Sequence, residues 1–184
     1  MHISRRSFLK QAAAGTFACM LPWPAARSAA AGMRRRGISG VLCVHNIHTG
    51  ESLRIRYFDD QGNWIAGARE KLDQIFRCHY NGTVKPIEPS LYLLIDRIHT
   101  RLGAGRRPVQ LISGYRSPEY NRLLRSRSSG VAKNSYHLKA MAADIHISGI
   151  NDRRLYQAAR EIKAGGAGSY SEFVHVDVGP VRFW

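Results

Sequence analysis

The chain is poor in acidic residues and in long apolar runs, and each shortage excludes a class of protein. Among 184 residues, 13 are Asp or Glu against 28 Lys or Arg, which gives a formal net charge of +15. Such a surplus favours polyanionic partners. The apolar stretch 11–21 is too short to span a bilayer, so no stable membrane insertion is expected. The chain lacks RNA-binding aromatic motifs and zinc-finger spacing, so nucleic acid is not the expected partner.

Cysteine is also scarce, and its placement argues against thiolate chemistry. Neither Cys43 nor Cys78 has a partner at CxxC spacing, so a thiolate metal site has no support. In an oxidising compartment these two thiols can form one disulfide, which the sequence alone does not decide. The stretch 113–115, Ser-Gly-Tyr, has no nucleophile-elbow pattern, and a serine or cysteine hydrolase is therefore set aside.

The first 31 residues have the order of an export signal. Arg5 and Arg6 precede an apolar residue and a lysine, an Ala-rich stretch follows, and the segment 29–31 offers small residues for cleavage. This order is typical of a twin-arginine signal peptide. We therefore expect a signal over 1–31, a linker over 32–40, and export by the twin-arginine machinery to the periplasm.

The remainder, 41–184, is expected to be a single α+β domain. Alternating apolar residues predict strands and a spacing near 3.6 predicts helices. Strands are expected over 41–48, 52–58, 109–112, 142–147 and 173–178, and helices over 63–78, 90–102, 118–127 and 151–163. We expect the helices to pack on a small, mostly antiparallel sheet.

Two short motifs in the last third carry residue types that bind metals. The first, Ser-Tyr-His-Leu-Lys-Ala-Met-Ala-Ala-Asp, contains His137 and Asp144, and the second, Glu-Phe-Val-His-Val-Asp, contains His175. Strand periodicity places Asp144 and His175 on polar faces, where neighbouring strands bring them together. Two imidazoles and one carboxylate leave a tetrahedral position free for water, as in catalytic zinc sites. We expect one Zn²⁺ per chain and a hydrolase, with Glu172 placed to take the proton of that water.

Four further residues are candidates for supporting the site. Asp177 is expected to orient a ligating imidazole, and His146 is either a supporting group or exposed. Ser135 is expected to position His137 or the substrate, and Tyr115 to line the cleft. For Ser135 and Tyr115, capping and core packing are equally good interpretations.

These motifs resemble a known family. Ser-x-His-x-x-x-x-Ala-x-Asp followed by Glu-x-x-His resembles the zinc peptidases grouped with lysostaphin, the D-alanyl-D-alanine metallopeptidases and hedgehog. More closely, the blocks 46–51, 113–118, 131–137 and 173–184 are similar to the YcbK-like murein endopeptidases, and the resemblance covers 38–184. It implies a hedgehog/D-Ala-D-Ala-peptidase-like fold and zinc-dependent cleavage of amide bonds in cross-linked peptidoglycan stem peptides.

The resemblance also implies a role for each site residue. His137, Asp144 and His175 would hold the zinc, and Glu172 falls at the position of the general base. Arg116 matches a basic residue that polarises the scissile carbonyl or holds a substrate carboxylate.

One departure from the family pattern keeps alternatives open. Ala140 stands where the family has glycine, a residue suited to a left-handed backbone conformation or to a close backbone approach, and where the loop needs either of these alanine strains it. A catalytically idle wall-binding module of the same fold is therefore one alternative. A carboxypeptidase that trims a terminal D-alanine is another, distinguished by whether the cleft is open on the product side.

Overall fold

The computed structural model describes residues 37–128 and 130–184, which form a seven-stranded sheet, four α-helices and one short 3₁₀ helix. The expected signal, 1–31, and most of the expected linker lie outside these residues. No helix within the described residues is long and apolar enough to cross a membrane. The strands are β1 (Val41–Asn46), β2 (Ser52–Arg56), β3 (Val109–Ser113), β4 (Ala142–Ile147), β5 (Gly166–Ser169), β6 (Val174–Asp177) and β7 (Arg182–Phe183). The helices are α2 (Ala68–Ile75), α3 (Pro89–Arg101), α4 (Pro118–Arg127), η1 (Tyr136–Lys139) and α5 (Asp152–Ile162).

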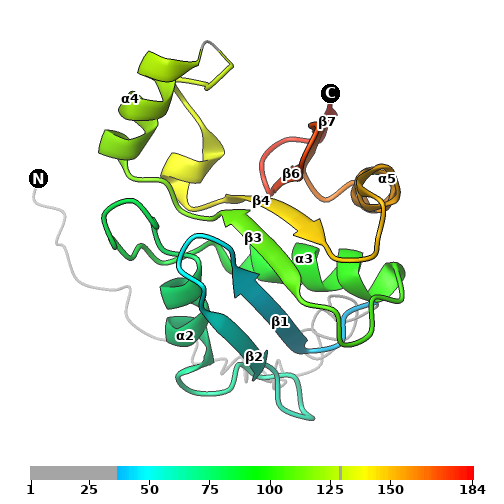
Figure 1. Cartoon of the computed structure of the whole chain (residues 1–184). Coiled ribbons are helices and arrows are strands. Elements are labelled where there is room, and N and C mark those ends of the chain that lie inside the picture. The colour runs from blue at the N-terminus through cyan, green and yellow to red at the C-terminus, as the bar shows by residue number, and fades with distance from the viewer. Residues whose placement is uncertain (1–36, 129) are drawn as a thin grey trace, which may run out of the picture. The chain divides into compact units, whose positions relative to one another are not determined.

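The strand order is β2-β1-β3-β4-β6-β5-β7, and the sheet is mixed (Figure 1). β1 runs parallel to β3 and β5 runs parallel to β7, whereas the other neighbours are antiparallel. The α+β class is confirmed, but the predicted small, mostly antiparallel sheet is corrected to a mixed sheet of seven strands, in which two of the six neighbouring pairs are parallel. β5 has the sequence Gly-Ala-Gly-Ser and β7 has only two residues, so neither shows the apolar alternation that reveals a strand.

The prediction of a helix over 63–78 also needs correction. The structure begins α2 five residues later, after Gly67, whose φ of 73° is left-handed and interrupts a right-handed helix. Trp64 instead forms an isolated antiparallel bridge with Phe58, and their rings meet edge to face at 4.9 Å. Local aromatic packing therefore overrides the apolar spacing.

The core between α3 and the sheet follows the sequence pattern. The apolar side of α3 is buried at the expected positions, against buried residues of β1 and β3. In the view of Figure 1, α3 crosses behind these strands, and α4 leaves the carboxyl end of β3 and extends away from the sheet. Both Cys43 and Cys78 are free thiols, with Cys78 fully buried. The core thus fixes β3 and β4, the strands that lead to the polar motifs.

Candidate metal centre

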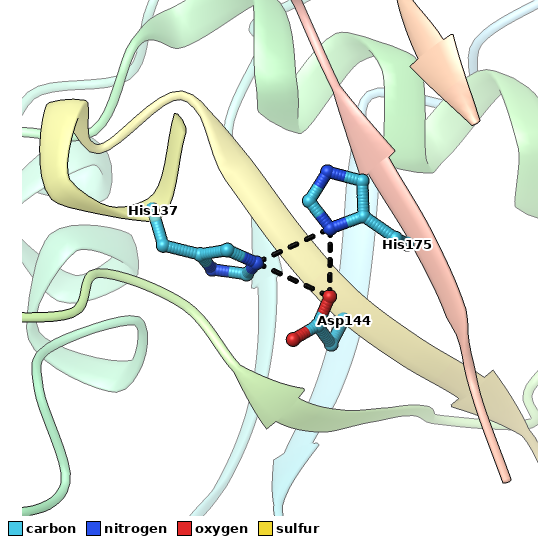
Figure 2. A group of neighbouring side chains, drawn as sticks. All are labelled: His137, Asp144 and His175. Carbon is cyan, nitrogen blue, oxygen red and sulfur yellow. Dashed lines mark hydrogen bonds and ion pairs between the residues drawn. The ribbon is translucent and has the colours of Figure 1, made fainter. Parts of the chain in front are cut away.

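Two neighbouring strands and one short helical turn bring the three expected ligands together. β4 and β6 pair antiparallel with Asp144 directly opposite His175. His137 lies in η1, which begins where the Ser135 hydroxyl accepts a hydrogen bond from the His137 amide at 3.3 Å. The chain then turns at Ala140, whose φ of 56° is left-handed, and enters β4. Figure 2 shows the three side chains pointing toward one another.

The ligand atoms form a small triangle. His137 Nε2 lies 3.1 Å from Asp144 Oδ1 and 3.2 Å from His175 Nδ1, and His175 Nδ1 lies 2.8 Å from Asp144 Oδ1. Ligands held tetrahedrally at zinc bond lengths of about 2.0–2.1 Å are about 3.3 Å apart. The exposed fractions of His137, Asp144 and His175 are 2%, 5% and 9%. The spacing and the burial both fit a metal ion.

The other ring nitrogens decide which atoms carry protons. His137 Nδ1 lies 2.8 Å from the Gly114 carbonyl, which can only accept, so this nitrogen donates. His175 Nε2 lies 3.1 Å from a carboxylate oxygen of Asp177 and donates to it. When both rings are neutral, their facing nitrogens therefore present lone pairs to Asp144. Three converging acceptors repel one another unless a cation lies between them, and this donor set suits a divalent transition metal.

The electrostatics of the cluster favour positive charge at its centre. Burial alone would raise the pKa of Asp144, but the charge of the adjacent His137 and the hydrogen bonds that both imidazoles donate when they are protonated hold it well below its usual range. Burial lowers the pKa of His137. Burial also acts to lower the pKa of His175, but the hydrogen bonds that its protonated ring donates to Asp144 and Asp177 raise it overall. The cluster therefore keeps its carboxylate ionised and ready to bind a cation.

Behind His175 lies an ion pair that the sequence did not reveal. Asp177, fully buried, accepts hydrogen bonds from Arg182 Nη1 at 3.1 Å and Nη2 at 2.7 Å. The Arg182 guanidinium lies between two rings, 4.8 Å from the Tyr136 centroid and 5.0 Å from that of Trp184. The expected place of Asp177 beside an imidazole is observed, and Arg182 fixes Asp177 in turn.

Arg116 lies on the other side of the cluster. Its Nη2 donates to Asp144 Oδ2 at 3.1 Å and to Ser113 Oγ at 3.2 Å, and its backbone amide donates to the His137 carbonyl. Its Nε is buried and has no hydrogen-bond partner among the residues that the structure describes. Arg116 thus holds the second carboxylate oxygen and keeps a donor available.

The cluster opens into a cleft of about 510 Å³. Tyr170 and Phe173 line it with rings stacked at 4.6 Å, and the Trp184 indole donates to the Tyr170 hydroxyl at 3.0 Å. Arg116, Arg182 and the segment 130–136 form most of the remaining lining. A second hollow of about 640 Å³, beside α5, is lined by arginines and contains no such ligand cluster.

Three of the expected site residues lie elsewhere. Glu172 is exposed and does not line the cleft. Tyr115 is buried against the core, with the Lys85 ammonium 5.5 Å from its ring centroid, and it too is outside the cleft lining. His146 bonds to Asp152 at 2.7 Å, away from the ligands. Core packing is therefore the better of the two interpretations offered for Tyr115.

The sequence matches characterised proteins over nearly its whole length. Residues 36–184 match the family model described as "Peptidoglycan L,D-endopeptidase MepK". The protein of that name from Escherichia coli K12 is 42% identical over 183 residues, 98% of this chain and 97% of that protein. A "Probable peptidoglycan L,D-endopeptidase MepK" from Haemophilus influenzae is 38% identical, over 78% of each chain.

A solved structure, the L-Ala D-Glu endopeptidase ChiX of Serratia marcescens, aligns with a TM-score of 0.34 and 21% identity. The alignment covers 52% of this chain and 68% of that one, a likeness too distant to carry over individual residues.

Proposed function

This chain belongs to the peptidoglycan L,D-endopeptidase MepK family, and we propose that it is a zinc enzyme that hydrolyses peptide bonds in cross-linked peptidoglycan. The names of its relatives specify a bond between L and D centres, and we propose the same stereochemistry here. The relatives are endopeptidases, which favours internal cleavage over removal of a terminal D-alanine. The intact ligand set argues against an idle wall-binding module.

One observation carries the metal part of the proposal. In the neutral rings, both ligand nitrogens of the His137–Asp144–His175 triangle are unprotonated, because the other nitrogen of each ring donates elsewhere. One Zn²⁺ fits this mixture of two imidazoles and one carboxylate. When bound, the ion supplies a Lewis acid for the scissile carbonyl and a water whose pKa is lowered to about 7.

The chain's own residues hold and complement this centre. Asp177, fixed by Arg182, keeps the plane and the tautomer of His175 suited to ligation. Ser135 caps the turn that carries His137. Arg116 places a cation at the edge of the cleft, where it stabilises negative charge that develops on the substrate carbonyl.

The proposal includes how the chain is exported to the compartment that contains its substrate. Residues 1–31 have the order of a twin-arginine signal, and cross-linked peptidoglycan lies outside the cytoplasm. We propose that the chain is exported by this route and acts in the periplasm. Removal of 1–31 takes away Arg5, Arg6, Lys10 and Arg27 and no acidic residue, and the net charge of +11 that remains favours the carboxylate-rich wall. These residues lie outside the described part of the chain.

Zinc content and cleavage, measured together, test the proposal. The zinc-loaded wild type should contain one zinc and release the products of cross-linked muropeptides, identified by mass spectrometry. His137→Ala should lose both properties. His45→Ala is the matched control, because the His45 ring contacts the Ser52 hydroxyl outside the cleft, and this variant should keep both. A folded wild type that binds zinc without cleaving would overturn the assigned reaction, and one that cleaves without metal would overturn the metal centre.

The same assay decides the role of Glu172. Glu172 is the candidate base only because of its position in the Glu-x-x-His motif. Its carboxylate is exposed and does not line the cleft. General bases contribute about 10²–10⁴-fold to rates. From its placement we expect Glu172→Gln to lower kcat by less than about tenfold, and a loss above 10² would restore the motif-based role.

A further inference from the structure

Four aromatic rings from three separate segments stack on the surface outside the cleft. His48 lies in the turn between β1 and β2, His79 and Tyr80 follow α2, and Tyr120 lies in the first turn of α4. The His48 and His79 rings stack at 3.9 Å, His79 meets Tyr120 edge to face at 4.9 Å, and Tyr80 stacks on Tyr120 at 5.0 Å. We call these four residues the aromatic strip.

The aromatic strip is held in place although two of its rings, His48 and Tyr80, are exposed. His79 Nε2 and the Tyr120 hydroxyl are hydrogen-bonded at 3.1 Å, and the Asn81 amide donates to the Ser117 hydroxyl at 3.2 Å. These bonds tie the loop after α2 to the start of α4. The Tyr80 and Tyr120 planes differ by only 9°, yet 47% of Tyr80 is exposed. Core packing does not account for a fixed ring that leaves so much of its surface open.

The aromatic strip carries little charge on a strongly basic chain. Burial, with the nearby His48 and Arg116, lowers the pKa of His79 to about 4, so its imidazole is neutral at neutral pH. Aromatic faces bear a negative quadrupole that attracts polarised C–H bonds. The polar tips of the same rings supply hydroxyl and imidazole groups for hydrogen bonds. A ligand with C–H faces and hydroxyl edges, such as a pyranose, matches both properties.

The aromatic strip also adjoins the cleft. Arg116 lines the cleft, its charge acts on His79, and Ser117, which follows it, caps the helix that carries Tyr120. In peptidoglycan the stem peptides hang from an amino-sugar chain. An enzyme that seats the peptide in the cleft brings that sugar chain to the neighbouring surface.

We propose that the aromatic strip binds the amino-sugar strand of peptidoglycan while the cleft holds the stem peptide. This inference rests on the proposed function, whose substrate supplies both parts.

Two forms of one substrate test the inference. Cross-linked muropeptides that retain their sugars are compared with the same cross-linked peptides after the sugars have been removed. Tyr80→Ala in the zinc-loaded chain should lower kcat/KM on the sugar-bearing form by about three- to tenfold, through KM, because it removes a stacking face. On the sugar-free form the change should stay below twofold. Tyr156→Ala, on α5 and outside both the cleft and the aromatic strip, is the control and should match the wild type on both forms.

A binding measurement separates this inference from the proposed function. Peptide-free amino-sugar strands are titrated into the zinc-loaded chain, and His48 and His79 are followed by NMR. Their signals should move in the wild type and move less in Tyr80→Ala, even if no substrate is cleaved. Equal losses of kcat/KM on both substrate forms would assign the aromatic strip to the peptide and overturn the inference. Strands that leave both histidine signals unmoved would overturn it as well.

Discussion

Single residues determine not only the position of each metal ligand but also which ring nitrogen of a histidine faces the metal centre. His175 has two ring nitrogens, and only the Asp177 carboxylate behind it directs the unprotonated one toward Asp144. Asp177 is fully buried, and an ionised carboxylate there needs a cation nearby. Arg182 supplies that cation. The geometry of the ligand therefore depends on a residue that does not touch the metal.

Arg182→Gln should therefore weaken zinc binding while leaving all three ligands in place. Changes to groups that orient a metal ligand typically reduce affinity about 10–100-fold, and we expect a loss in that range. The measurement is competition for zinc with a chelator of known affinity at constant pH. Arg160→Gln is the control, because Arg160 also lies over aromatic rings but has no contact with Asp177. Equal zinc affinities of wild type and Arg182→Gln would show that Asp177 alone suffices.

At the scale of elements, the junction between η1, which carries His137, and β4, which carries Asp144, contains a strained residue. Ala140 has a left-handed backbone, as its place in the family pattern led us to expect, and it is fully buried. A left-handed non-glycine residue costs about 1–2 kcal/mol. Glycine would relieve that cost, but it would lose a buried methyl worth about 0.8 kcal/mol and raise the entropy of the unfolded chain by a similar amount. The opposing effects nearly cancel.

Ala140→Gly should change the free energy of unfolding by less than about 1 kcal/mol. Ala143→Gly, at an equally buried position within β4, relieves no strain and should destabilise by about 1–2 kcal/mol. Urea unfolding of the metal-free chains measures both variants. If the two variants lost equal stability, Ala140 would be unstrained despite its backbone angles.

The two strands that carry Asp144 and His175 were predictable, whereas the short helix η1 that carries His137 and the surroundings of the ligands were not. β4 was expected with its observed bounds because Ala, Ile and a polar pair alternate there, and Ser117-Pro118 marked the start of α4. β5 was not predicted, because glycines stand along it in place of the larger apolar side chains that reveal a strand. At Gly168 an added Cβ would lie 2.4 Å from the Trp184 ring, so the glycine reflects an approach by a distant residue. Local sequence does not encode such contacts.

On the scale of the whole molecule, the sheet joins two surfaces through one short segment. β3 leads into Ser113 and Arg116 at the metal centre, and the same chain continues into α4, whose first turn carries Tyr120. The turn after β1 and the loop after α2 bring His48, His79 and Tyr80 to Tyr120 and complete the aromatic strip. A polymer substrate can therefore contact both surfaces at once, which explains why a wall hydrolase keeps exposed rings beside its cleft.

Global stability should respond to pH through His79. The folded chain holds this imidazole neutral, with a pKa of about 4, because it is half-buried beside His48 and Arg116, whereas an unfolded chain takes up the proton near pH 6.5. Protonation thus favours the unfolded state. The contribution of His79 is complete above pH 6.5, declines as the pH falls toward 4, and is constant below that. Because solvent screens a half-buried group, we expect a loss of roughly 1 kcal/mol.

Comparison of the wild type with His79→Phe isolates this effect, since the site carboxylates and the metal ligands titrate alike in both chains. Phenylalanine keeps a ring between His48 and Tyr120 but cannot take up a proton. Urea unfolding between pH 7.5 and 4 should show the wild type losing about 1 kcal/mol more than the variant, most of it between pH 6.5 and 4. Parallel curves would mean that His79 is protonated as easily in the folded chain as in the unfolded one. The neutral character of the aromatic strip at neutral pH would then rest on the ordinary pKa of histidine rather than on its burial.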